Sequence, residues 1–443
     1  MDVRLASLSE RLRNSLFFIP MAYVVAAVLL GVLAVELDRL IVDATAELPF
    51  GLSSTVDSSR AILGTIASAT ITFAGIAFSI SLLVIQLASS QFSPRVVRGL
   101  LRDPFTKQIM GVVIGTFTYC LVVLRAVRGP LEEGGDPVIP SLSVGIALVL
   151  GVVSILAIVA FINHSAHSMD VSRILARATD EGVAAVRRLW DEEPQTGSDP
   201  ERLPEAPPDH LVVTHGADGW VQDIDFARLA ASAPPGGTVR LETEVGRYAI
   251  AGTPLCRIWP RPDDVEDCSE KARGSIYTGD SRTVEQDVGY AVRQLADVAL
   301  RALSPGINDP TTAQDAIFHL GSVLRELLRR HPPRLAAPAE EDRLLLRPER
   351  RSHGELIEVA FNEVRLAATG MPTVSVYMLE VLHLLDEAID ASDEGLADAR
   401  AEIRRQAALI RSGVDHTDLG AYDADRIRGA HDRRFGPPVE RTS

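Results

Sequence analysis

Four long apolar stretches occupy the first 170 residues of the chain, and short polar segments separate them. They cover residues 16–35, 61–87, 108–124 and 141–162. Each is near the length of about 20 residues that a helix needs to cross a hydrocarbon core of about 30 Å. Residues 36–60 and 129–140 between them are expected to be short loops. The pattern therefore predicts an α-helical membrane domain with four transmembrane helices.

The second stretch combines this apolar character with a regular row of small and hydroxylated side chains. Two sets of positions each repeat at seven-residue spacing, and the second set follows the first by three residues. On a helix the two sets share one face. Its members are Thr65, Ser68, Thr72, Gly75, Ser79, Leu82, Gln86 and Ser89.

This face has two interpretations. Small residues let helix backbones approach closely, and hydroxyls bond across the contact, so the face is typical of helix packing. In an oligomer the same face could line a water-filled path, where hydroxyls and the Gln86 amide replace part of the hydration shell of an ion. We expect it at a symmetric subunit interface or a lumen, because polar groups in hydrocarbon have few partners. Leu82 is its one bulky apolar residue and the candidate gate.

Basic residues predict the orientation of the four spans. Arginines precede the first span and follow the fourth, and Arg95, Arg98, Arg102 and Lys107 separate the second from the third. Because loops rich in basic residues stay on the cytoplasmic side, we expect both termini there. Arg95, Arg98 and Arg102 would then form an electropositive cytoplasmic mouth.

The remainder of the chain changes character twice. The helical pattern continues to residue 190, a segment rich in proline and acidic residues covers 191–210, and short alternating strands with glycine turns fill 211–275. We expect a membrane domain (1–190) with a helical extension, a linker (191–210), a small β-barrel-like module (211–275) and a helical domain (276–443). The strands resemble lipoyl-type half-repeats, but the hairpin carries no lysine for modification.

Helix-start signals recur in the last region. Thr283 and Gln286 have capping-box spacing, as do Ser352 and Glu355. Asp309 followed by Pro310 predicts the start of a second helix that pairs with the first. Further helices are expected over 352–369, 374–391 and 395–412.

The stretch ALRALSPGINDPTTAQDA, residues 299–316, joins that expected helix pair. A tight turn explains it, with Gly306 at a positive φ and Asn308 and Asp309 bonding to nearby backbone. The alternative is a ligand or anion site made by Arg301, Asn308, Asp309 and the free amides of the helix start.

Charge and composition narrow the function classes. The formal net charge is −15, and nearly all of it lies beyond Asp170, which argues against nucleic acid as a partner. The three cysteines lack metal-ligand spacing and predict free thiols. His164, His167 and Asp170 share a helix face, which indicates anchoring at the headgroup level more than a metal site or a pH sensor. We expect no enzyme activity, no cofactor and no metal.

Several blocks of the chain together resemble the bacterial DUF2254 family of predicted membrane proteins. They are QLASSQFSPRVVRGLLRD, IGTFTYCLVVLRAV, the histidine-containing end of the fourth span, GWVQDID and RTVEQDVGYAVRQLADVALRALSPGINDPTTA. The resemblance implies a four-span protein of the bacterial inner membrane with a cytoplasmic C-terminal half, and it implies no activity.

These observations favour a homo-oligomeric ion channel whose second span lines the path and whose cytoplasmic part regulates it. The expected partners are the lipid bilayer, further copies of the chain and small inorganic ions. The alternative is a membrane-anchored ligand-sensing or scaffold protein without transport activity.

Overall fold

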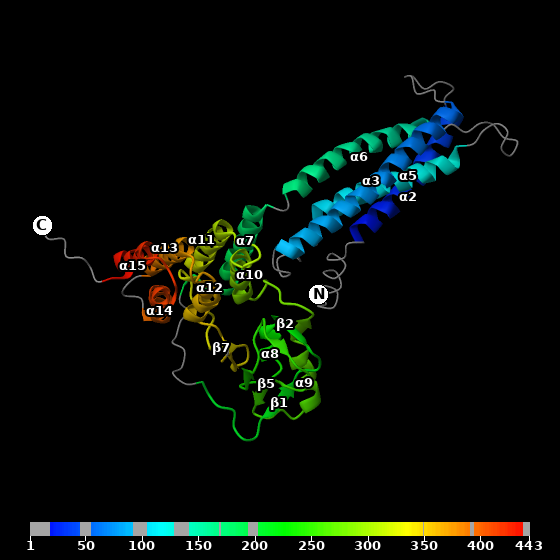
Figure 1. Ribbon diagram of the computed structural model, residues 1–443. Helices are drawn as coiled ribbons and strands as arrows, with labels where there is room; N and C mark the ends of the chain where they lie inside the picture. Colours follow the sequence, from blue (N-terminus) through cyan, green and yellow to red (C-terminus); the bar gives the residue numbers. More distant parts are fainter. Residues whose placement is uncertain are drawn as a thin grey trace. The chain divides into compact units, whose positions relative to one another are not determined.

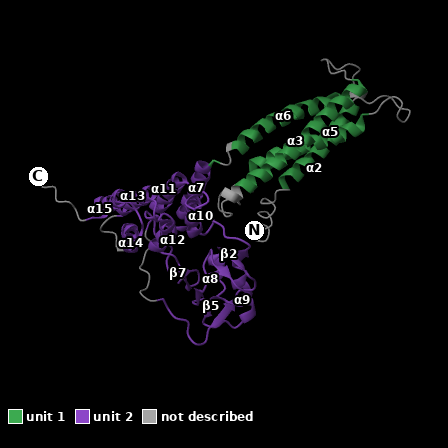
Figure 2. Ribbon diagram, viewed as in Figure 1, with its two compact units in different colours: residues 1–170 green, residues 171–443 purple. Residues whose placement is uncertain are grey.

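The structure is a computed structural model of the chain, and it describes residues 18–44, 55–91, 104–127, 141–167, 170–193, 203–348, 350–389 and 394–436. It divides into two compact units, Met1–Asp170 and Val171–Ser443 (Figure 2).

Unit 1 contains four long helices: α2 (Phe18–Ala44), α3 (Val56–Gln91), α5 (Pro104–Ala126) and α6 (Ser141–His167). All four are long and apolar enough to cross a membrane, so the four predicted stretches are helices and candidate spans. The helices extend beyond the apolar stretches, because a charged residue ends the apolar stretch without ending the helix. Glu36 and Arg39 form an ion pair at 2.8 Å within α2, in a segment that the sequence placed in a loop.

Helix α5 is the central helix of unit 1 and packs against α2, α3 and α6. Two of its glycines allow close approach to α2. A Cβ at Gly111 would lie 2.6 Å from Cδ2 of Tyr23, and one at Gly115 would lie 3.4 Å from the Tyr23 carbonyl oxygen. This small-xxx-small spacing is a common means of packing membrane helices.

A carboxylate of α2 caps the start of α6. Asp38 is buried and accepts hydrogen bonds from the backbone amides of Leu142 and Ser143, both at 2.9 Å, and from the Ser143 hydroxyl at 2.6 Å. The Tyr119 hydroxyl donates to the Ser143 carbonyl at 3.0 Å. Three helices are therefore joined at this end of unit 1, and the amides at the start of α6 have an anionic partner.

Most of the helices of unit 2 form a stack of hairpins (Figure 1). α7 packs on α10 and α11, and from there each helix packs on the helix two places later: α10 on α12, α11 on α13, α12 on α14 and α13 on α15. This is the packing scheme of α-solenoids. The helices are α7 (Val171–Leu189), α10 (Val288–Ala302), α11 (Pro310–Leu327), α12 (His353–Ala367), α13 (Pro372–Ala388), α14 (Ala397–Gly413) and α15 (Ala421–Phe435).

Two sheets form the rest of unit 2. One has the strand order β1-β5-β3-β8-β7 and the other the order β4-β2-β6, and side chains from both sheets share one apolar core. The helices α8 (Phe226–Ala230) and α9 (Val265–Arg273) contribute to that core. The strands are β1 (Leu211–Thr214), β2 (Gly219–Ile224), β3 (Thr238–Leu241), β4 (Tyr248–Ala249), β5 (Pro254–Trp259), β6 (Ile276–Gly279), β7 (Ala336–Ala339) and β8 (Arg343–Leu346).

The structure differs from the sequence-based division in three places. α7 packs in unit 2, although it was attached to the membrane domain. The strands β6, β7 and β8 fall in the region expected to be helical, and β8 pairs in parallel with β3 about 100 residues earlier. The capping box expected at Thr283 is wrong: α10 begins after Asp287, which accepts from the amide of Tyr290 at 2.9 Å.

Candidate functional site in helix α3

The small and hydroxylated face of α3 points away from the other helices of unit 1. Thr65, Ser68, Thr72, Gly75, Ser79, Leu82 and Gln86 are all exposed. The side of α3 that packs inside the protomer carries Leu63, Ala67, Thr70 and Ala77 instead, and all four are buried. A single copy of the chain therefore leaves this face uncovered in the part of unit 1 that the structure describes, and brings no second helix opposite it.

Hydroxyls on this face bond to their own helix. Thr65, Thr72 and Ser79 each donate to the carbonyl oxygen four residues earlier, at 2.7, 2.7 and 2.9 Å. Such back-bonding is common for serine and threonine within helices. The sequence analysis argued that hydroxyls facing hydrocarbon would have few hydrogen-bond partners. These bonds correct that argument, because the hydroxyl hydrogens have partners within the helix even where the face meets lipid. Among the described residues, the Gln86 amide has no hydrogen-bond partner, and it is the polar group that a surrounding helix or water would satisfy.

The surroundings of Gly75 differ from those of the glycines on the packed helix faces of unit 1. A Cβ at Gly75 would meet no heavy atom within 4 Å, whereas a Cβ at Gly111 or Gly31 would meet a side-chain atom within 3 Å. Glycines thus serve close packing inside the protomer at α5 and α2. Gly75, in contrast, is not in close contact with any of the described residues.

The structure describes only some of the remaining predicted site residues. Ser89 continues the row on α3, but its side chain lies outside the described residues, as do Arg95, Arg98 and Arg102 as a whole. Leu82, the candidate gate, is 51% exposed. One of the polar contacts inside unit 1 that the sequence analysis missed is internal to the helix packing, where the buried Ser154 hydroxyl donates to the Thr116 hydroxyl at 3.0 Å. Neither residue belongs to a periodic polar row, so no pattern indicated it.

The turn between α10 and α11 is a helix cap. Asp309 accepts from the amide of Thr312 at 3.1 Å and from its hydroxyl at 2.6 Å, and these bonds lower the pKa of Asp309. Asn308, not Gly306 as predicted, has the positive φ, of 49°. The carboxylate of the chain itself therefore occupies the helix start that a bound anion would need.

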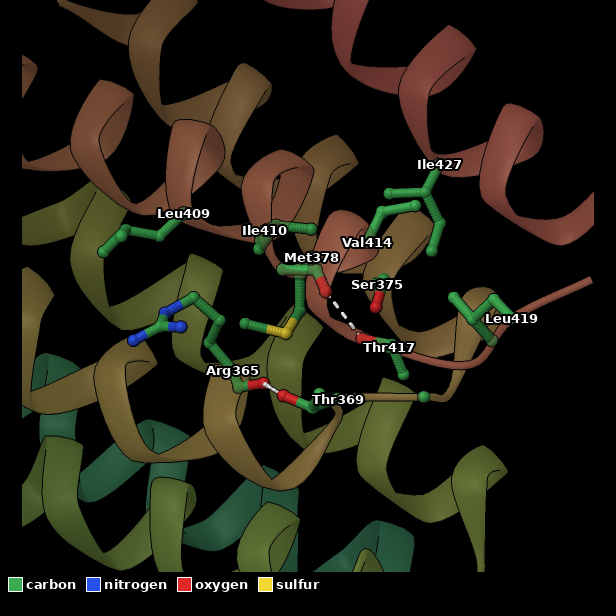
Figure 3. Close-up of a pocket in the computed structure, with 12 residues that line it drawn as sticks. Arg365, Thr369, Ser375, Met378, Leu409, Ile410, Val414, Thr417, Leu419 and Ile427 are labelled. Atoms are coloured by element: carbon green, nitrogen blue, oxygen red, sulfur yellow. Dashed lines mark hydrogen bonds between the residues drawn. The ribbon is translucent and has the colours of Figure 1, made fainter. Parts of the chain in front are cut away.

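A small pocket lies between α12, α13, α14 and α15 (Figure 3). Its volume of about 30 Å³ corresponds to a single water molecule. Arg365 lines it and is already bonded, to the Gln406 amide oxygen at 3.2 Å and to that of Asn362 at 3.0 Å. The pocket is a packing space of the helical stack.

Comparison with known proteins places the chain in a family. The family described as "Predicted membrane protein (DUF2254)" matches residues 13–383, which include all four spans, both sheets and the stack as far as α13. The chain belongs to the DUF2254 family.

Two mycobacterial relatives match most of the chain. An uncharacterized protein of Mycobacterium bovis and one of Mycobacterium tuberculosis are each 30% identical over 384 residues, which cover 85% of this chain and 72% of the relative. No solved structure matches the chain at a significant level. DUF2254 membership thus supports a membrane protein with this architecture, and function has to be argued from the site.

Proposed function

We propose that this DUF2254 protein is a homo-oligomeric ion channel of the inner membrane, in which α3 of each copy borders the path. The observation that carries the proposal is the exposed small face of α3, which has no partner within the described part of the protomer. Packing of a second copy there would bring Gly75 against a neighbouring backbone, as Gly115 is used inside the protomer.

A path bordered by this face would be lined by polar atoms at regular intervals along the axis of α3. The carbonyl oxygens that accept from Thr65, Thr72 and Ser79 are already occupied by the helix hydrogen bond and by the hydroxyl, but the hydroxyl oxygens themselves remain acceptors. These hydroxyl oxygens and the Gln86 amide, which offers both donors and an acceptor, suit the partial replacement of an ion's hydration shell. Leu82 interrupts this row with an apolar side chain and is the gate in this proposal.

The orientation adds a charged entrance. With both termini cytoplasmic, Arg95, Arg98 and Arg102 of every copy would surround the cytoplasmic end of α3 and would enrich anions there. The acidic remainder of the chain opposes this charge. Unit 2 would be cytoplasmic and would serve as the regulatory part.

A scaffold function without transport is the second candidate. It is favoured by the helical stack of unit 2, because stacked hairpins commonly offer extended surfaces for binding partners. Under this candidate the α3 face would be a dry contact between copies.

Reconstitution of the full-length protein into ion-loaded vesicles tests the channel. The proposal expects ion flux above that of protein-free vesicles and a larger flux for Leu82→Ser, because a polar ring would wet the narrowest point. Leu83→Ser, one position away on the helix, is the matched control and should leave the flux unchanged. A purified monomer, or flux no higher than in protein-free vesicles, would overturn the channel.

A further inference from the structure

A groove of about 420 Å³ opens in unit 2 between helix α8 and the β7–β8 hairpin. Its walls are mostly small and apolar, with alanines of α8 on one side and Ala337, Pro338 and Ala339 of β7 on the other. β7 is an edge strand of the five-stranded sheet. The volume lies within the range of about 300–1,000 Å³ that is typical of small-molecule sites.

Arg347 places a cation at this groove that has no counter-ion among the residues that the structure describes. It is half-buried, and its guanidinium carbon lies 4.0 Å from the centre of the Phe226 ring, which also lines the groove. In the described part of the chain its side chain has no hydrogen bond and no acidic partner, and its Nε is buried without one. Burial and the neighbouring charge of Arg350 both lower the pKa of Arg347.

The other charged residues of the groove are placed differently. Arg343 is engaged, since its Nε donates to the Ala233 carbonyl at 2.8 Å and it pairs with Glu341 at 2.7 Å. Glu340 is exposed at the groove and would oppose a bound anion. Arg347 is therefore the group whose charge a ligand would satisfy, and the apolar walls would cover the rest of that ligand.

We propose that this groove binds a small organic monocarboxylate, with the carboxylate on the Arg347 guanidinium and an apolar body against α8 and β7. Arginine and carboxylate have matching planar geometry and form paired, charge-assisted hydrogen bonds. The shape favours an apolar acid over an inorganic anion, because phosphate or sulfate would leave the alanine and proline walls uncovered. The site is separate from α3 and does not depend on the channel.

Benzoate binding to the full-length protein in lipid nanodiscs tests the site, read by calorimetry. Benzamide supplies the same ring without the charge, and sulfate supplies charge without the ring. Arg347→Met should weaken benzoate binding at least about tenfold, because it removes the charged hydrogen bonds. Ala231→Leu should weaken it by filling the groove while Arg347 stays in place, and Glu340→Gln should bind at least as tightly as the unaltered protein.

Thermal unfolding provides the control for folding. Arg347→Met should unfold within a few degrees of the unaltered protein without benzoate, because the arginine has no acidic partner to lose within the described chain and the methionine side chain can replace part of the contact with the Phe226 ring. The proposal is overturned if benzoate does not bind at millimolar concentration, if benzamide or sulfate binds as tightly as benzoate, or if both Arg347→Met and Ala231→Leu keep full affinity.

Discussion

Replacing Gly75 by leucine should weaken self-association of the chain without destabilising the fold of the protomer. In the protomer a Cβ at this position meets no heavy atom within 4 Å, so the added side chain should be accommodated without strain. Leucine also favours the helix over glycine by up to about 1 kcal/mol. Gly75→Leu should therefore fold at least as stably as the unaltered protein.

The same replacement at Gly111 should destabilise the fold of the protomer. There the Cβ would lie 2.6 Å from Cδ2 of Tyr23, and overpacking of this kind costs about 1–3 kcal/mol. If a neighbouring copy covers Gly75 as closely as Tyr23 covers Gly111, a similar penalty falls on association. It would weaken each contact between copies about 5- to 150-fold.

The assay is the mass distribution of purified protein in detergent over a range of concentrations, together with thermal unfolding. Gly75→Leu should shift the distribution toward monomers and keep its unfolding temperature. Gly111→Leu should lower the unfolding temperature. If Gly75→Leu stays fully oligomeric at the dilution where the unaltered protein begins to dissociate, the face is not an interface.

Three further predictions concern both units. Leu320→Ala in α11, at a fully buried position, should destabilise unit 2 by about 2–5 kcal/mol in thermal unfolding, whereas Leu384→Ala, 52% exposed, should change it by less than about 0.5 kcal/mol. Burial lowers the pKa of His353 more than its bond to the Arg330 carbonyl raises it, so its proton binds the unfolded chain more tightly. Stability should be complete above the ordinary histidine pKa of about 6.5 and fall as the pH drops below it, and His353→Gln should reduce that slope in denaturation at several pH values. In asymmetric chloride salts, reversal potentials should show anion preference that weakens when the mouth arginines are replaced by glutamine; strong cation selectivity would contradict the assignment of Arg95, Arg98 and Arg102.

The sequence predicted best those elements whose signals are local. Ser352 and Glu355 form the expected capping box, with the Ser352 amide donating to Glu355 at 2.9 Å, and Gly370 ends that helix region at a φ of 85°. The four candidate spans were also predicted as helices, because a long apolar stretch is itself a local signal of a membrane helix.

Elements that depend on distant partners were not predictable in the same way. The hairpin β7–β8 has ordinary local composition, and its strand character comes from pairing with β3, far earlier in the chain. Gln286 suggested a cap but instead accepts from the Ile224 amide of β2 at 3.1 Å. Asp38 was placed in a loop because its partner at the start of α6 is about 100 residues away.

The periodic row read from the sequence lies on an exposed side of α3, and the described part of the protomer leaves it uncovered. Its polarity was overestimated, because the hydroxyls bond to their own backbone. Arg347 was missed, since arginine is frequent in this chain and only the structure shows that this one is half-buried at a groove, with no acidic partner among the described residues.

Cysteine modification at Ser79 tests most directly whether the α3 face borders a wet path. The background is low: all three native cysteines are buried, and in unit 2 burial raises the pKa of Cys268 to about 11 and that of Cys256 higher still. In vesicles carrying Ser79→Cys protein, a charged, water-soluble thiol reagent should label the new cysteine and change the ion flux. The same reagent should leave the unaltered protein unaffected. An introduced cysteine that stays inert to the reagent and crosslinks efficiently between copies, with no change in flux, would contradict the channel and leave the face as a packing contact.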